Sequence, residues 1–86
     1  MLTRTLALEL APYNIRVNSI SPGIIHTEGV SSPEAIEYNK QRMHRVPMGR
    51  PGSPDEIGNV ALFLASPASS YVTGSDIIAD AGWTLT

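Results

Sequence analysis

The chain has 86 residues and a formal net charge of −2, with six Lys and Arg against eight Asp and Glu. The basic residues are scattered, which argues against nucleic-acid binding because phosphate contacts need a basic patch. The sequence has no apolar run of membrane-spanning length, no signal-like start and no cysteine, so it predicts a small cytoplasmic protein without disulfides or thiolate metal sites.

Residues 2–11 (LTRTLALELA) predict a helix, because leucines recur every four residues along it. Pro12 ends this helix, since proline lacks the backbone donor and clashes with the preceding turn. The periodic pattern begins directly after Met1 without a convincing N-cap. We therefore interpret residues 1–11 as the end of a helix whose first turns are missing.

Two short segments predict strands. Residues 15–20 (IRVNSI) are rich in β-branched side chains and end at Ser21-Pro22-Gly23. Residues 76–80 (DIIAD) form the second candidate and are closed by Ala81-Gly82.

Two helices are expected between these strands. Residues 33–45 begin with a proline, which is tolerated in a first helical turn, but their apolar positions are sparse. Residues 54–65 carry a clearer signal, because Ser53 and Glu56 have the spacing of a capping box. Apolar residues then follow at i, i+3, i+4 and i+7, which predicts one buried stripe: Ile57, Val60, Ala61 and Leu64. Gly58 within this helix suggests close packing against a neighbour.

The expected order is helix, strand, helix, helix, strand. Two strands joined by a long helical connection should be parallel, and parallel strands are normally covered on both faces. Two strands with three helices cannot supply that cover. The sequence therefore predicts an α/β chain that forms one edge of a larger doubly wound sheet.

Three consecutive blocks resemble the C-terminal part of short-chain dehydrogenases/reductases. They are ALELAPYNIRVNSISPGIIHTE, VPMGRPGSPDEIGNVALFLASPASSYVTG and DIIADAGWT, and they occur in the family's order. The resemblance covers nearly all of residues 1–86 and is weakest over 29–45. It implies the C-terminal portion of a Rossmann-like doubly wound parallel sheet.

The resemblance also implies a cofactor loop. The family's P-G-x-I-x-T pattern matches Pro22, Gly23, Ile25 and Thr27. Ile25 would offer backbone contacts to the nicotinamide carboxamide of NAD or NADP, and Thr27 a hydroxyl contact. Ligands of open α/β sheets bind beyond the carboxyl ends of the strands, where this loop would lie.

Two further segments complete the expected binding region. Residues 21–32 would form the loop that faces cofactor and substrate, and residues 33–48 a cover over a small carbonyl or alcohol substrate. The resemblance also implies that residues 54–65 and 76–86 pack against a second subunit, which predicts a homo-oligomer.

The family's catalytic parts have no match in these 86 residues. The glycine-rich phosphate turn and the catalytic serine are not found, and Tyr13, Tyr38 and Tyr71 are not followed by lysine four residues later. We therefore assign no catalytic residue and expect the chain alone to be inactive. One alternative is a non-catalytic oligomerisation module derived from this family. Another is a misassigned start, with a complete enzyme encoded upstream.

Other polar residues are interpreted as structural. His26, Glu28 and His44 fit no metal-ligand spacing, so no metal site is expected. Arg50 favours a hydrogen-bonded turn over an anion site. Trp83 is expected to pack on a neighbouring subunit or on the sheet edge. Asp76 and Asp80 could be taken for paired carboxylates, but four residues along a strand separates them widely.

Overall fold

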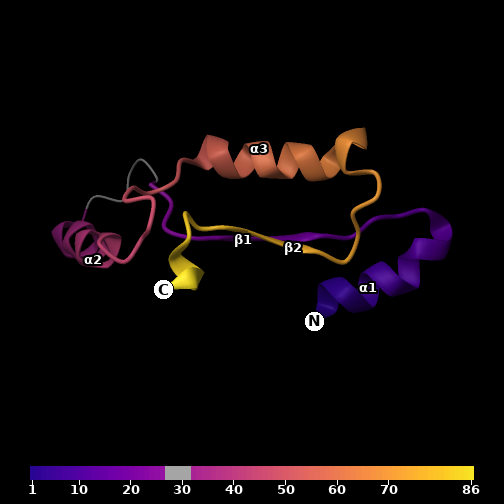
Figure 1. The fold of residues 1–86 in the computed structure, drawn as a ribbon, viewed down its shortest axis with the longest axis horizontal. Coiled ribbons are helices and arrows are strands. Elements are labelled where there is room, and N and C mark those ends of the chain that lie inside the picture. The colour runs from indigo at the N-terminus through magenta and orange to yellow at the C-terminus, as the bar shows by residue number, and fades with distance from the viewer. Residues whose placement is uncertain (27–31) are drawn as a thin grey trace.

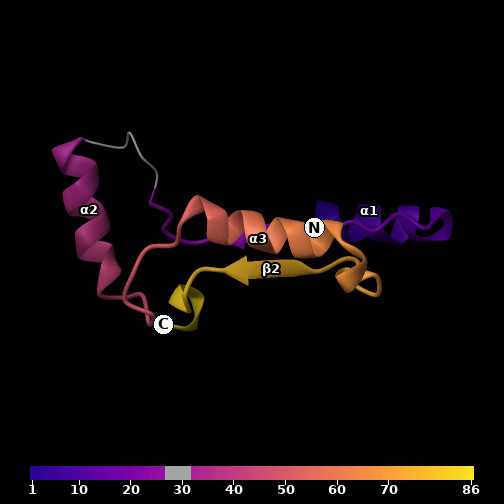
Figure 2. The same ribbon diagram turned by 90° about the horizontal axis from the view of Figure 1, so that it is seen from above.

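The computed structural model describes residues 1–26 and 32–86 as an α/β arrangement. The regular elements are α1 (Leu2–Leu10), β1 (Ser19–Pro22), α2 (Pro33–Met43), α3 (Pro54–Ala65) and β2 (Asp76–Ala79), with short 3-10 turns at 11–13, 67–69 and 83–85. α3 runs along one face of the two strands, and α1 lies on the other side of them (Figure 1). α2 lies beyond the end toward which β2 points (Figure 2).

The two strands pair in parallel, as the sequence predicts, with Ser19 opposite Asp76 and Pro22 opposite Ala79. The pairing differs from the predicted strand at 15–20, because the ladder begins only at Ser19 and extends to Pro22.

Side chains interrupt the ladder before Ser19. The Val17 N–H donates to Oγ1 of Thr73 at 3.1 Å, and Nδ2 of Asn18 donates to the Val72 carbonyl at 3.0 Å. Oδ1 of Asn18 in turn accepts from the Ser75 N–H at 3.0 Å. A backbone bond from the Gly74 N–H to the Val17 carbonyl, at 2.7 Å, adds to these side-chain bonds. Residues 15–18 are therefore held beside the approach to β2 by contacts that period-2 patterning does not reveal.

The capping box of α3 is present as predicted. Oγ of Ser53 accepts from the Glu56 N–H at 3.2 Å, and Oε1 of Glu56 accepts from the Ser53 N–H at 3.1 Å. These bonds satisfy two of the amides that a helix start leaves without partners. The helix covers Pro54–Ala65, the residues of the expected segment.

The apolar stripe of α3 is only half buried. Ile57, Val60 and Leu64 are intermediate in exposure, and Ala61 is exposed, so the prediction of a buried stripe is wrong for this chain. A Cβ at Gly58 would meet no atom within 4 Å, so Gly58 has no close neighbour in the described chain. Two strands are too narrow to cover the whole stripe.

α1 contacts the rest of the chain through its small residues. Ala7 is 5% exposed and lies near Gly74, where an added Cβ would come within 3.5 Å of the Ala7 Cβ. Leu2, at 71% exposure, belongs to the leucine stripe but has no cover. The chain turns after Pro12 at Asn14, which takes a left-handed conformation with φ of 60°.

Arg16 joins the start of the sheet to the end of α3. Its Nη2 donates to the Leu64 carbonyl at 2.9 Å, and its Nη1 donates to the Val72 carbonyl at 3.2 Å. The last carbonyls of a helix lack intrahelical donors, and a cation near them is favoured by the helix dipole. Arg16 therefore caps α3 from outside the helix.

The arrangement is elongated. Its radius of gyration is 15.8 Å, and its extents are 49 × 25 × 20 Å, whereas a compact domain of this length would have a radius of about 12 Å. Ala7 and Val46, each 5% exposed, are the buried apolar residues in the described part of the chain. This shape agrees with the expectation that the strands form the edge of a larger sheet.

The helices of residues 1–26 and 32–86 include none that is both long and apolar enough to cross a bilayer.

Candidate functional site

The carboxyl ends of the two strands converge at Gly23. The Gly23 N–H donates to the Ala79 carbonyl at 3.1 Å, directly after Pro22 ends β1. A Cβ built on Gly23 would come 2.7 Å from Cβ of Asp80 and 2.8 Å from its Cα. Glycine is therefore required by the close approach of the two backbones, which explains the Pro-Gly break after the strand.

The chain beyond Gly23 is held by a second parallel pairing, between Ile25 and Gly52. The Gly52 N–H donates to the Ile24 carbonyl at 2.9 Å, and the His26 N–H donates to the Gly52 carbonyl at 2.8 Å. Both backbone groups of Gly52 are thus used by the neighbours of Ile25.

This pairing leaves the backbone of Ile25 itself free on its other side. Successive residues of an extended chain direct their N–H and C=O groups to alternate sides, so those of Ile25 face away from Gly52. Neither group has a hydrogen bond to any residue that the structure describes. Ile25 therefore offers an adjacent donor and acceptor at the carboxyl end of the sheet.

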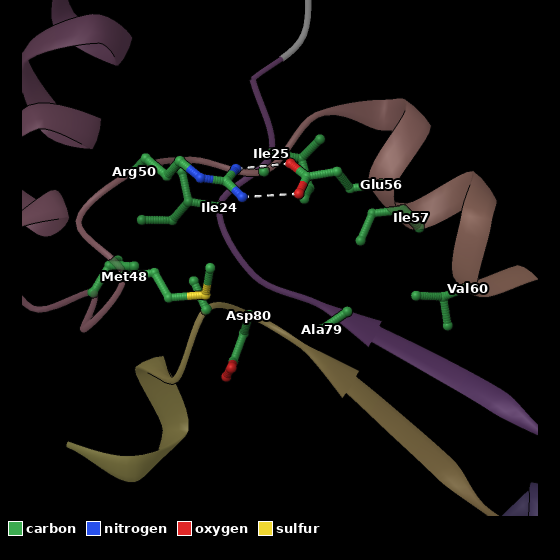
Figure 3. Close-up of a pocket in the computed structure, with 12 residues that line it drawn as sticks. Ile24, Ile25, Met48, Arg50, Glu56, Ile57, Val60, Ala79 and Asp80 are labelled. Carbon is green, nitrogen blue, oxygen red and sulfur yellow. Dashed lines mark hydrogen bonds and ion pairs between the residues drawn. The ribbon is translucent and has the colours of Figure 1, made fainter.

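A cleft of about 220 Å³ lies beside these residues, under the start of α3 (Figure 3). Its wall is largely apolar and comes from the loop after β1, the connection between α2 and α3, and α3 itself: Ile24, Ile25, Val46, Met48, Ile57 and Val60. Ala79 and Asp80 close it from the end of β2.

An ion pair closes one rim of this cleft. Nη1 and Nη2 of Arg50 donate to Oε1 and Oε2 of Glu56 at 2.8 and 2.9 Å (Figure 3). The hydrogen bond from Arg50, with that from the Ser53 amide, lowers the pKa of Glu56 to about 2, and the carboxylate in turn raises the pKa of Arg50. Arg50 also donates to the Pro51 carbonyl at 3.2 Å, which agrees with its interpretation as a turn residue.

The two aspartates of the last strand have separate structural contacts. Asp76 accepts hydrogen bonds from the hydroxyls of Ser19 and Ser21, each at 2.9 Å to Oδ1. Asp80 accepts from the amides of Gly82 and Thr84, both at 2.9 Å. Desolvation opposes ionisation of Asp80, but the amide bonds together outweigh it and lower its pKa.

A second cleft, of about 440 Å³, lies between α2 and the loop after β1. Its wall is mainly apolar, with His26, Asn39 and Lys40 as polar members. The apolar members are Ile24, Ile25, Ile36, Met43 and Pro51. α2 itself has Ser32 as N-cap, whose Oγ accepts from the Ala35 N–H at 3.1 Å. Ile24 and Ile25 are common to both clefts.

The structure thus brings three of the four predicted site residues together at the carboxyl ends of the strands. Pro22 and Gly23 lead from β1 to Ile25, which lines both clefts. Thr27, and with it Glu28, lies outside the described residues. Within the residues that are described, no three His, Asp or Glu side chains gather in a way that could hold a metal ion.

The role of Gly52 could not be foreseen. The sequence identifies it as part of a turn, but its pairing with Ile25 is long-range and leaves no local pattern. Ala81 is similar: it adopts φ of 58°, which an alanine rarely does.

Comparison with known proteins gives a consistent assignment. A family model described as enoyl-(acyl carrier protein) reductase matches residues 1–84. The galactitol 2-dehydrogenase (L-tagatose-forming) of Cereibacter sphaeroides is 47% identical over 85 residues, and the match covers 98% of this chain and 34% of that enzyme. The NAD-dependent glycerol dehydrogenase of Listeria innocua is 44% identical over 84 residues, and the match covers 98% of this chain and 33% of that enzyme.

Solved structures agree. A short-chain type dehydrogenase/reductase from Mycobacterium marinum superposes with a TM-score of 0.88 at 49% identity, covering 99% of this chain and 33% of that one. A second structure comes from Agrobacterium tumefaciens; the protein is proposed to be a 2-deoxy-D-gluconate 3-dehydrogenase and was solved with bound NADP. It superposes with a TM-score of 0.88 at 40% identity, and the match covers 99% of this chain and 35% of that one.

The chain belongs to the short-chain dehydrogenase/reductase family. The resemblance and the Rossmann-type α/β fold class predicted from the sequence are thereby confirmed. The chain spans about a third of the length of the relatives it matches.

Proposed function

We propose that Pro22, Gly23, Ile25 and Thr27 form the nicotinamide side of an NAD or NADP site in a short-chain oxidoreductase. The observation that carries the proposal is the N–H and C=O pair of Ile25, which lies beside an apolar cleft and has no hydrogen bond to residues 1–26 or 32–86. A carboxamide has one acceptor and two donors, so an adjacent backbone donor and acceptor can hold it in one orientation. The likeness to a protein solved with bound NADP supports a nicotinamide cofactor for this family member.

The bound nicotinamide would exchange a hydride with a carbonyl or secondary-alcohol carbon, while the hydroxyl proton passes to or from an acid–base group. The role of this chain in that reaction is to orient the ring and exclude water. Ile24 and Ile25 supply apolar contact, and Pro22-Gly23 fixes where the loop leaves β1. We assign none of its residues to acid–base catalysis and expect the 86-residue chain alone to be inactive.

We extend the proposal to α2 and residues 44–48 as the substrate cover. α2 forms one wall of the 440 Å³ cleft, and the loop that carries Ile25 forms the other. A ligand in this cleft would therefore touch the proposed nicotinamide site. The substrate class remains a small carbonyl compound or alcohol.

The test uses a chimera in which residues 1–86 replace the matching third of the Listeria innocua glycerol dehydrogenase. Ile25→Pro removes the free N–H, whereas Ile25→Ala keeps it and shortens the side chain. Loss of one hydrogen bond should weaken NAD binding about five- to tenfold in the proline variant, measured by calorimetry. We expect a smaller change for alanine.

Equal NAD affinity for Ile25→Pro and the unmodified chimera would contradict the proposal. So would alcohol oxidation by the 86-residue chain alone, above a blank without protein.

A second candidate is a non-catalytic oligomerisation module. It is favoured by large apolar side chains that lie exposed on α3 and at the C-terminal end, among them Leu62 at 66% and Leu85 at 86% exposure. Residues 54–65 and 76–86 would then pair with a second copy. Light scattering decides: a dimer that Leu62→Lys dissociates supports this candidate, and a folded monomer contradicts it.

A further inference from the structure

α2 has little packing of its own. None of its residues is buried, and the hydrogen bonds at its start and end stay within residues 32–46. Helices this short gain most of their stability from tertiary contacts rather than from intrinsic propensity. The position of α2 must therefore depend on a few contacts made elsewhere.

The most specific of these contacts is made by Arg42 in the last turn of α2. Its guanidinium carbon lies 4.9 Å from the ring centroid of Tyr38 and 4.4 Å from that of Trp83. Tyr38 is one helical turn earlier on α2, whereas Trp83 belongs to the 3-10 turn near the C-terminus. Guanidinium groups at this distance are attracted to aromatic faces, and Arg42 has no ion pair within the described chain.

Two further contacts join the same parts of the chain. The Met48 N–H donates to the Ala81 carbonyl at 3.2 Å. Gly82 lies so close to Pro47 that an added Cβ would be 3.0 Å from its Cγ. Residues 80–85 therefore contact both the end of α2 and the connection that follows it.

Residues 80–85 are themselves fixed to the sheet. The Asp80 carboxylate accepts from the amides of Gly82 and Thr84, which holds the 3-10 turn against the end of β2. Trp83 is thus a contact point whose place is set by the last strand.

We propose that Arg42 and Trp83 form a clasp that positions α2 as the wall of the 440 Å³ cleft. This inference rests on the proposed function of that cleft as the substrate site. Ile36, Asn39 and Met43 line the cleft from α2, so displacement of the helix moves all three away from Ile25. Arg42 is a positioning residue, because it acts on a ligand through α2.

The test compares Arg42→Ala with Arg42→Lys and with Arg45→Ala. Alanine has the highest helix propensity, so its introduction does not weaken the helix intrinsically. Lysine keeps the charge but loses the planar stacking group. Arg45 lies just beyond α2 and has no cation–π contact within the described residues, which makes it the matched control.

Two readouts report the clasp directly in the 86-residue chain. Trp83 is the single tryptophan, so its fluorescence should shift to longer wavelength when Arg42 no longer covers the ring. Amide hydrogen exchange over residues 33–43 should increase about threefold or more in Arg42→Ala, less in Arg42→Lys, and not in Arg45→Ala.

A third readout separates positioning from general stability. In the chimera, Arg42→Ala should raise KM for the alcohol about threefold or more while leaving NAD affinity unchanged, and Arg42→Lys should restore part of the difference. If the unmodified 86-residue chain exchanges fully, the exchange measurement is made in the chimera.

Unchanged amide exchange over residues 33–43 in Arg42→Ala overturns the clasp, whatever NAD affinity the Ile25 variants have. A different pair of results separates the two proposals. If Ile25→Pro leaves NAD affinity unchanged while amide exchange over residues 33–43 increases in Arg42→Ala, the cofactor proposal is overturned and the clasp is supported. Equal changes in KM and NAD affinity would show a merely structural role and also overturn the positioning proposal.

Discussion

Gly23 and Asp80 lie in direct backbone contact at the carboxyl ends of β1 and β2. A Cβ at Gly23 would sit 2.7 Å from the Asp80 Cβ and 3.3 Å from its carbonyl oxygen. The chain therefore reaches its loop at a point where the two strands leave no room for a side chain at residue 23. This contact sets the direction in which Ile24 and Ile25 enter the clefts.

Gly23→Ala should destabilise the chain by about 1–3 kcal/mol, because one backbone must move to admit the methyl group. Urea unfolding followed by circular dichroism measures the change. Gly58→Ala is the matched control: its Cβ enters open space within a helix, so we expect about 1 kcal/mol of added stability. Similar unfolding midpoints for the two variants would contradict this explanation.

Ala81→Gly should stabilise the chain. Ala81 has φ of 58°, and a left-handed conformation costs an alanine about 1–2 kcal/mol. Glycine removes this strain but adds about 0.5–1 kcal/mol of unfolded-state entropy, so the net gain should be about 0.5–1 kcal/mol. Thermal unfolding measures it, with Ala79→Gly in β2 as a control that should lose stability. A lower melting temperature for Ala81→Gly would count against the argument.

The capping network of α3 should weaken at acid pH. The pKa of Glu56 is lowered to about 2 from 4.5 by its bond to Arg50 and by the Ser53 amide. Because this pKa is lower in the folded state, the ionised Glu56 carboxylate adds to the free energy of unfolding. That contribution is complete above pH 4.5 and is lost as pH falls through about 2. Glu56→Gln should therefore flatten the pH dependence of the unfolding midpoint below pH 4.5.

A carbon-13 titration of the Glu56 carboxyl group checks the same prediction at the atom concerned. The matched control is Glu9→Gln, which removes a carboxylate that has no ion pair in the described chain. A midpoint near 4.5 for Glu56 would refute the network. Because the pair is exposed, added salt should also reduce the effect.

Arg16→Lys should lower stability by about 1–2 kcal/mol. Lysine keeps the charge but cannot donate in two directions to the carbonyls of Leu64 and Val72 as the guanidinium does. Arg4→Lys is the control, because Arg4 is exposed and its side chain donates no hydrogen bond to the described residues. Urea midpoints that fall equally in both variants would be evidence against the bridging role.

Local signals in the sequence were sufficient for several elements. The Ser53–Glu56 spacing predicts the capping box of α3, and both of its hydrogen bonds are present. The parallel pairing of the strands also follows, because a long helical connection permits it. Residues 15–18 belong to the strand that the sequence predicts but lie outside β1, because the side chains of Asn18 and Thr73 replace ladder bonds there. Such long-range contacts leave no local periodicity in the sequence.

The candidate site was predictable in its position but not in its construction. Pro22 and Gly23 indicate a break after a strand, and the family resemblance indicates what the loop faces. The pairing of Ile25 with Gly52 and the stacking of Arg42 on Trp83 join segments that are far apart in sequence. Charge, hydropathy and turn patterns report on neighbours along the chain, so they cannot reveal either contact.

The parallel pairing of β1 with β2 has a consequence for how the chain reaches this structure. Ser19 and Asp76 are 57 positions apart, so closing that loop reduces chain entropy before the first rung of the ladder forms. The capping box of α3, in contrast, joins Ser53 to Glu56 and can form within a local segment. We therefore expect assembly of the sheet to be the slow step in folding, because its contacts join distant parts of the chain.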